Sequence, residues 1–357
     1  MYKDYKQNQF LNIFLIITII SYVLGFYLNE DSAGGGKIDY LNHEWGTIQL
    51  FIKNDLSIAL NSILYESSRT PLFYIVNKFV PFNNDIKHLR IFWFVFSSLI
   101  PVLMYYTLRT IFQKDFQKVL VIFFSCIILI SPYFRSNAYW PSSENLQIFF
   151  VLSSLLFYLK LIHRTEKIKS DLFFLSSISI FFAYCAFYTD QKAFFLVALI
   201  YFDLVRRNDF MFFFIFSFLN ILLFVPAIYL FISWGGLVPI ESTNRIIKYA
   251  AGTNIFISTI GIYFVLIFIS NIFNKNFIKR LKVKTIDILL IVILSIFSFF
   301  TLPMAPITFG SGIISKLLGI MTVYMNYDWN IIKYLYFLIN LLFILIIFLL
   351  VQMTLRN

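Results

Sequence analysis

Apolar residues along this chain come in long uninterrupted runs separated by short polar stretches. The runs recur from Phe10 to Val351, and after Ile91 no long polar interval separates them. A helix needs about 20 residues to cross the roughly 30 Å of bilayer hydrocarbon, and the runs reach or approach that length. The pattern predicts an all-α polytopic membrane protein with about ten transmembrane helices, and it leaves no room for a soluble domain.

We expect a single transmembrane domain over residues 1–357. The first run follows Lys3 and Lys6, and Asn29, Glu30 and Asp31 come after it instead of a small-residue cleavage site, so we interpret it as an uncleaved first helix. The expected spans cover residues 10–28, 90–112, 117–132, 143–162, 170–188, 192–205, 209–233, 253–273, 285–302 and 331–353.

Composition agrees with this class of protein. Apolar residues make up 60% of the chain and charged residues 13%, so a water-soluble fold would expose far more apolar surface than water tolerates. The net charge of +11 lies in short loops and forms no basic stripe, so we expect no nucleic-acid partner. Cys126 and Cys185 fall inside apolar runs, which excludes a disulfide framework and a CxxC-type metal cluster.

Lys and Arg are concentrated in every second loop, as orientation by positive charge requires. The basic loop residues are Arg109, Lys114, Lys118, Lys160, Arg164, Lys167, Lys169, Arg206, Arg207, Lys275, Lys279, Arg280, Lys282, Lys284 and Arg356. We therefore place the N-terminus and these loops in the cytoplasm of a bacterium, in a multi-pass protein of the inner (cytoplasmic) membrane. The opposite loops then face the periplasm or exterior.

Whether the segment 70–82 crosses the membrane decides on which side all later loops lie. It holds about 13 residues, opens with Pro71 and contains Asn77 and Lys78, which favours an interfacial or re-entrant segment over a span. Residues 29–89 then form one large external region with two or three juxtamembrane helices. The other external stretches are 131–145, 188–192, 234–254 and 302–330, so the elaborate polar and aromatic loops share one side of the membrane.

The strongest candidate for chemistry lies directly after the first span. The sequence NEDSAGGGKIDYLNHEW contains a dense group of ionisable residues, namely Glu30, Asp31, Asp39, His43 and Glu44. Carboxylates at the mouth of a membrane cavity serve as a general base or bind a divalent metal. Three glycines at 34–36 permit a sharp reversal that brings Asp31 toward Asp39. A solvated acidic loop stays the alternative, and we assign no metal ligands.

The second external loop, SPYFRSNAYWPSSEN, holds Arg135 before an aromatic stretch, with Glu144 and Asn145 in the first turn of the next helix. Helix capping by Ser142 or Ser143 is the alternative explanation for this polar cluster.

Two further sites hold cations on the external side. Lys192 lies in the turn YTDQK, either paired with Asp190 or contacting a phosphate. Arg245 and Lys248 share one face of any helix formed there, which suggests an anionic partner such as a lipid phosphate; anchoring to phospholipid headgroups is the alternative.

These motifs together resemble the GT-C superfamily of membrane glycosyltransferases, which includes protein O-mannosyltransferases and the lipid A aminoarabinose transferase. The resemblance covers about residues 1–255, with 256–357 as additional C-terminal helices. It is carried by the acidic pair Glu30-Asp31, the segment SRTPLFYIVNKF, the loop SPYFRSNAYWPSSEN with Glu144, and Lys192 in the YTDQK turn. The acidic pair here has the order Glu-Asp, whereas relatives have Asp-Glu, and a further acidic residue follows at Asp39. The resemblance therefore does not decide which carboxylate is the base.

The resemblance implies an inverting hexosyl- or pentosyltransferase that uses a polyprenyl-phosphate-linked sugar and acts on a glycan or lipid acceptor of the cell envelope. Asp31, with Asp39 second and Glu30 beside it, would deprotonate the acceptor hydroxyl. Lys192, Arg245 and Lys248, assisted by Arg135, would stabilise the phosphate leaving group. We also expect substrate contacts from His43, Glu144 and Asn145.

Two other functions compete with this interpretation. A polymerase of O-antigen or capsule repeat units is also many-spanned, and it is expected to rely on arginines more than on an acidic pair. A flippase or transporter of lipid-linked glycans would show ionisable residues deep within spans and internal repeats, whereas here the charges gather at external helix ends.

Overall fold

A computed structural model of the protein describes residues 2–31, 35–65, 67, 69–112, 118–163, 169–236, 239, six positions between 291 and 299, and 328–354. These residues form helices and turns and no strand. The chain divides into two compact units, Met1–Thr243 and Asn244–Asn357, and each is described by itself.

The first unit contains eight longer or medium helices and a set of short ones. The former are α1 (Tyr2–Tyr27), α6 (Ile86–Ser97), α7 (Leu99–Phe112), α8 (Lys118–Cys126), α10 (Ser143–Ile162), α11 (Lys169–Thr189), α12 (Phe194–Arg207) and α13 (Phe210–Trp234). The short ones are α2 (Gly36–Asp39), the π-helix η1 (Tyr40–Glu44), α3 (Trp45–Lys53), α4 (Leu56–Leu60), α5 (Leu72–Phe79), the 3₁₀ turns η2 (Ile127–Ile130) and η3 (Gln191–Ala193), and α9 (Pro132–Tyr139).

Among the described residues, four helical segments are long and apolar enough to cross a membrane, which indicates a helical membrane protein. They are Ile86–Ile111, Ser143–Ile162, Asp171–Thr189 and Phe210–Trp234. The pair Leu120–Ile130 and Pro132–Tyr139, bent by 66°, supplies a fifth if it is one span.

The expected number of ten spans is not confirmed. The apolar stretches Asn12–Tyr27 and Ile331–Ile346 are too short to cross by themselves, but they belong to the 26-residue helices α1 and α19 (Trp329–Thr354). The expected span 192–205 corresponds to α12, whose 14 residues rise about 21 Å. The span 253–273 lies outside the described residues, and 285–302 is described only at six positions.

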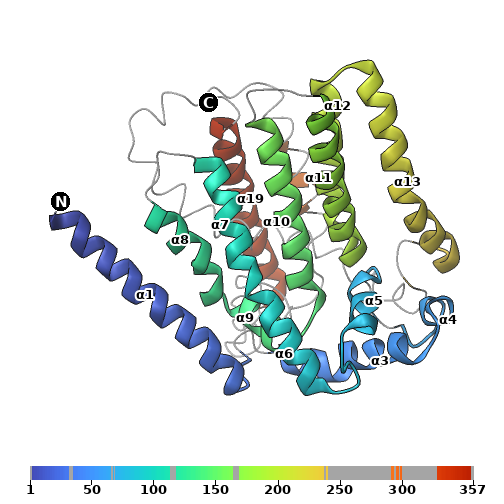
Figure 1. The fold of residues 1–357 in the computed structure, drawn as a ribbon, viewed down its shortest axis with the longest axis horizontal. Coiled ribbons are helices and arrows are strands. Elements are labelled where there is room, and N and C mark those ends of the chain that lie inside the picture. Colours follow the sequence, from blue (N-terminus) through green and yellow to red (C-terminus); the bar gives the residue numbers. More distant parts are fainter. Residues whose placement is uncertain are drawn as a thin grey trace. The chain divides into compact units, whose positions relative to one another are not determined.

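Between α1 and α6 the chain forms the short helices α2 to α5, which lie together at the lower edge of Figure 1. The segment 70–82 contains α5, an eight-residue helix that rises about 12 Å and is too short to cross a bilayer. Two contacts fix these helices to the bundle. The Thr70 hydroxyl donates to the Phe187 carbonyl at the end of α11 (2.7 Å), and the Trp234 indole at the end of α13 donates to the Leu60 carbonyl (3.0 Å).

Helix α9 packs against the last turns of α1 and against α6. It begins because Ser131 caps its N-terminus by accepting from the Phe134 amide and Pro132 occupies a first-turn position, where its missing N–H costs nothing. The Tyr139 hydroxyl donates to the Tyr22 carbonyl of α1 at 2.6 Å. The Tyr22 ring stacks on Phe94 of α6 with centroids 5.0 Å apart, so an aromatic core holds the three helices together.

Helices α10 and α11 pack along a row of serines. Ser154 and Ser179 exchange hydrogen bonds, each hydroxyl donating to the other residue's carbonyl at 2.8 and 3.0 Å. Both side chains are fully buried. Small hydroxyl residues let helices approach closely in a bilayer, where water does not drive their association. This pair of helices therefore forms a firm frame for the loops at its ends.

Candidate functional site

The first part of the candidate site is an ion pair at the end of α1. After Tyr27 the chain reverses at Asn29, a left-handed residue with φ 54°, and Glu30 donates its amide to the Gly25 carbonyl at 2.9 Å. The Glu30 carboxylate then meets Arg135 of α9, whose side chain is 11% exposed. A Cβ added at Gly25 would collide with the ends of Glu30 and Arg135, so a larger residue there would displace this ion pair.

Asp31, next along the chain, binds a different set of groups. Its oxygens accept the amides of Gly35, Gly36 and Lys37 at 3.1, 3.0 and 3.2 Å and the Ser136 hydroxyl at 2.9 Å. Partial burial raises the pKa of the Asp31 carboxyl, but the hydrogen bonds from Ser136 and the three amides outweigh it and hold the pKa below its ordinary value. Asp31 thus closes the turn between α1 and α2, and its low pKa makes it a weak base.

The second part of the candidate site is a partly buried group around Arg69. This guanidinium forms ion pairs with Glu44 (3.2 Å) and with Glu144 at the start of α10. The Tyr74 hydroxyl donates to the other Glu44 oxygen at 2.6 Å. Burial raises the pKa of the Glu44 carboxyl, and the proximity of Glu144 adds to the rise, while Arg69 and Tyr74 oppose it. A carboxylate with a raised pKa at the end of a helix bundle marks a functional candidate.

Trp140 and Arg90 adjoin the first part of the site. The Trp140 indole donates to the Glu30 carbonyl at 3.1 Å, and the Arg90 guanidinium carbon lies 3.8 Å from the centroid of its ring. Sequence reasoning did not single out Arg69 or Arg90. Both are arginines in or beside the external region 29–89, against the usual distribution of positive charge, and that exception is the signal that points to them.

The remaining expected residues are placed as follows. Asp39 is exposed at the end of α2; its amide donates to the Gly35 carbonyl at 2.9 Å, and its carboxylate has no hydrogen bond or ion pair within the described part of the chain. Asn145 is buried and donates to Ser97 Oγ and the Phe134 carbonyl at 2.9 and 3.2 Å, so its amide joins α10 to α6 and α9. The Lys192 side chain is 87% exposed and lies 3.5 Å from Asp190. Arg245 and Lys248 lie outside the described residues.

His43 lines a hollow of about 340 Å³ on the outer face of η1 and α3. The other lining residues are Asn42, Gly46, Thr47, Gln49, Leu50, Lys53, Asn54 and Leu64. Most of its lining area is apolar, but the side chains of Asn42, His43 and Gln49 can contact hydroxyl groups, and Asp39 precedes Asn42 and His43 by about one helical turn. No group of three or more His, Cys, Asp or Glu side chains that could hold a metal ion occurs among the described residues.

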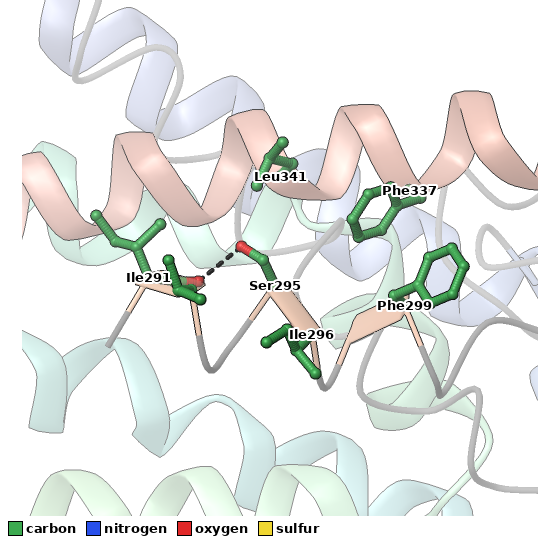
Figure 2. Close-up of a pocket in the computed structure, with 7 residues that line it drawn as sticks. Ile291, Ser295, Ile296, Phe299, Phe337 and Leu341 are labelled. Carbon is green, nitrogen blue, oxygen red and sulfur yellow. Dashed lines mark hydrogen bonds between the residues drawn. The ribbon is translucent and has the colours of Figure 1, made fainter. Parts of the chain in front are cut away.

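The second unit contains another cavity, of about 370 Å³, between residues 291–299 and α19 (Trp329–Thr354). Figure 2 shows Phe299 facing Phe337 of α19, and their centroids are 5.4 Å apart. Its polar lining residue, Ser295, donates its hydroxyl to the Ile291 carbonyl at 2.6 Å. Its described lining residues carry no ionisable side chain, and they offer contacts for apolar chains.

Comparison of the chain with protein-family models, with curated proteins and with solved structures found no match. The geometry of the site therefore carries the functional argument by itself.

Proposed function

We propose that the protein is a membrane glycosyltransferase that moves a sugar from a polyprenyl-phosphate-linked donor to a cell-envelope acceptor on the external face. One observation supports this proposal above the others. The acidic residues that follow α1 converge with Arg69, Arg90, Arg135 and Glu144 at one end of otherwise apolar helices. Ionisable groups are expensive at a membrane, and their collection at one helix end favours a site for a charged, lipid-linked substrate.

Asp39 is the carboxylate that we propose as the general base. A base needs an accessible oxygen, and Asp39 is exposed beside the hollow at His43, whereas Asp31 is occupied by four hydrogen bonds. In the reaction, the Asp39 carboxylate takes the proton of the acceptor hydroxyl while the acceptor oxygen bonds to the anomeric carbon. The bond from that carbon to the phosphate oxygen breaks, and the phosphate leaves with the electron pair.

The test is transfer of radiolabelled sugar from polyprenyl-phosphate donors in membranes that contain the full chain. Loss of a general base lowers the rate about 10²- to 10⁴-fold, which we expect for Asp39→Asn. Asp209→Asn is the matched control, because Asp209 caps α13 through the Phe212 amide and asparagine caps helices equally well. Wild-type transfer in both Asp39→Asn and Asp31→Asn would remove the proposed base.

A repeat-unit polymerase is a second candidate, favoured by the presence of three arginines in one site. Two of them are bound to carboxylates, Arg69 to Glu44 and Glu144 and Arg135 to Glu30, which supports single sugar transfer better. The two functions differ in their products. A ladder of repeat lengths made from a lipid-linked oligosaccharide would support the polymerase, and addition of one sugar would support the transferase.

A further inference from the structure

Two cations face the ring of Trp140. The Arg90 guanidinium carbon lies 3.8 Å from its centroid and the Lys37 ammonium 5.3 Å. Within the described ranges, neither cation forms an ion pair with a carboxylate. The nearby acids have other partners, because Glu30 is paired with Arg135 and Asp31 accepts four hydrogen bonds. Two positive charges thus lie at the same ring, and neither is paired with a carboxylate in the described part of the chain.

Arg90 also has unused hydrogen-bonding capacity. Its Nε donates to the Tyr139 carbonyl at 2.7 Å and its Nη1 to Asn29 Oδ1 at 2.8 Å, which fixes the plane of the guanidinium. Its Nη2 is buried and has no partner among the described residues. A buried guanidinium N–H without an acceptor is costly, and an incoming anion is the kind of group that would satisfy it.

A third unsatisfied group lies next to this pair. The Tyr40 side chain is 1% exposed, and its hydroxyl has no hydrogen-bond partner in the part of the chain that is described. The Tyr40 and Trp140 rings have centroids 6.3 Å apart. Burial raises the pKa of the Tyr40 hydroxyl, and the Arg90 guanidinium opposes that rise, so the hydroxyl stays a neutral donor close to Arg90.

We propose that Arg90, Lys37 and the Tyr40 hydroxyl bind a single phosphate group of an anionic lipid. A guanidinium held in one plane suits the tetrahedral oxygens of a phosphate, and a flexible ammonium adds charge. Arg90 lies four residues after the start of the apolar segment Ile86–Ile111, and thus near one of its ends, where lipid phosphates are found. Identification of the lipid as polyprenyl monophosphate rests on the proposed function; the phosphate site itself does not.

The alternative is that Arg90 only joins α6 to α9 through the Tyr139 carbonyl. Lys37 separates the two roles, because its exposed side chain faces the Trp140 ring and forms no hydrogen bond or ion pair within the described residues. A purely structural Arg90 predicts that Lys37→Gln changes nothing. Arg90→Lys keeps the charge and loses the planar fork, so a phosphate site predicts partial retention of binding.

The experiment is native mass spectrometry of the purified full chain in detergent, titrated with polyprenyl monophosphate and, separately, with uncharged polyprenol. We expect Lys37→Gln and Arg90→Gln each to weaken phosphate-lipid binding about tenfold, the loss of one charge-assisted contact, without changing polyprenol binding. Arg207→Gln is the matched control, because Arg207 is paired with Asp203 at 2.6 Å on α12, away from Trp140. Wild-type affinity in both Lys37→Gln and Arg90→Gln would overturn the site.

Competition identifies the source of the phosphate. Phosphatidylglycerol or inorganic phosphate that displaces polyprenyl monophosphate at equal concentration would overturn the carrier assignment. Failure of the proposed function gives a different result, namely no sugar transfer by the wild type although the Lys37 and Arg90 variants lose phosphate-lipid binding. Failure of this inference alone gives normal sugar transfer and normal phosphate-lipid binding in both variants.

Discussion

Glu30 and Asp31 are neighbours in sequence with opposite surroundings. Glu30 turns back toward α1 and pairs with Arg135, while Asp31 turns outward and gathers the amides of Gly35, Gly36 and Lys37. A Cβ at Gly36 would collide with the Ser136 hydroxyl, so the glycine-rich stretch is needed where the loop passes α9. Glu30 therefore connects the end of α1 to α9, and Asp31 closes the loop between α1 and α2.

Asp31→Asn tests this role in loop closure through its pH dependence. The pKa of Asp31 is held below its ordinary value, so its charge adds stability above about pH 4 that is lost as pH falls through the lowered pKa. We expect the free energy of unfolding of the variant at pH 7 to be lower by about 1 kcal/mol. This value is small for hydrogen bonds to a charged group, because the loop is partly solvated. Its stability should also change less between pH 5 and about pH 3.

Thermal unfolding in detergent across that pH range measures both effects. Asp39→Asn is the comparison, because the Asp39 carboxylate is exposed and unbonded in the described part of the chain, and the variant should unfold like the wild type. Identical pH profiles for Asp31→Asn and the wild type would show that Asp31 does not hold the loop.

Sequence analysis found many members of the site but not their pairing. Glu30, Asp31, Arg135 and Glu144 all lie in motifs that mark external loops, and the structure places them at one end of the helices. The partners Arg69 and Arg90 were missed because periodicity says nothing about which loop residues meet. Thr70 binding to Phe187 brings Arg69 to Glu144, and that contact joins residues 117 positions apart.

At the scale of elements, some long apolar runs were predicted closely, whereas the short helix α9 between two of them was not predicted. The runs 143–162 and 209–233 match α10 and α13 closely, because twenty apolar residues allow few other structures. Residues 131–145 were expected to be a loop, yet α9 occupies Pro132–Tyr139. The Ser131 cap and the proline in the first turn are start signals whose effect depends on the aromatic contacts of α9 with α1 and α6.

The Tyr188 hydroxyl of α11 forms hydrogen bonds with two backbone groups of α13 next to Pro226. It donates to the Leu223 carbonyl at 2.6 Å and accepts the Ala227 amide at 3.1 Å, two groups that an undisturbed helix pairs with each other. Polar backbone groups in a bilayer need such partners. We expect Tyr188→Phe to lower the free energy of unfolding by about 1 kcal/mol, a typical value for a hydrogen bond between membrane helices.

A double-mutant cycle with Pro226→Ala measures this coupling in detergent unfolding. Alanine restores an amide to the helix, so Tyr188→Phe should lower the free energy of unfolding less in the Pro226→Ala background. If Tyr188→Phe lowers the free energy of unfolding equally in both backgrounds, the hydrogen bonds of the hydroxyl are independent of the proline.

At the scale of the first unit, the two ends of the helices differ in charge. Figure 1 shows α7, α10 and α12 ending at the edge opposite to α2–α5. Arg109, Lys160, Arg206 and Arg207 lie in the last turns of those three helices. The Arg69, Arg90 and Arg135 sites lie at the other end with the acids of residues 30–44. This polarity is the arrangement that the positive-inside rule predicts for a protein with its site outside.

The last prediction concerns this orientation. Asn84 is exposed in the turn before α6, and Arg206 is exposed at the end of α12. With Cys126 and Cys185 replaced by serine, Asn84→Cys should react with a membrane-impermeant maleimide on intact cells and Arg206→Cys only after permeabilisation. Reaction of both from the same side would contradict the topology. Reaction of Arg206→Cys alone would invert it, which would place the acidic site in the cytoplasm and exclude a donor presented on the external face.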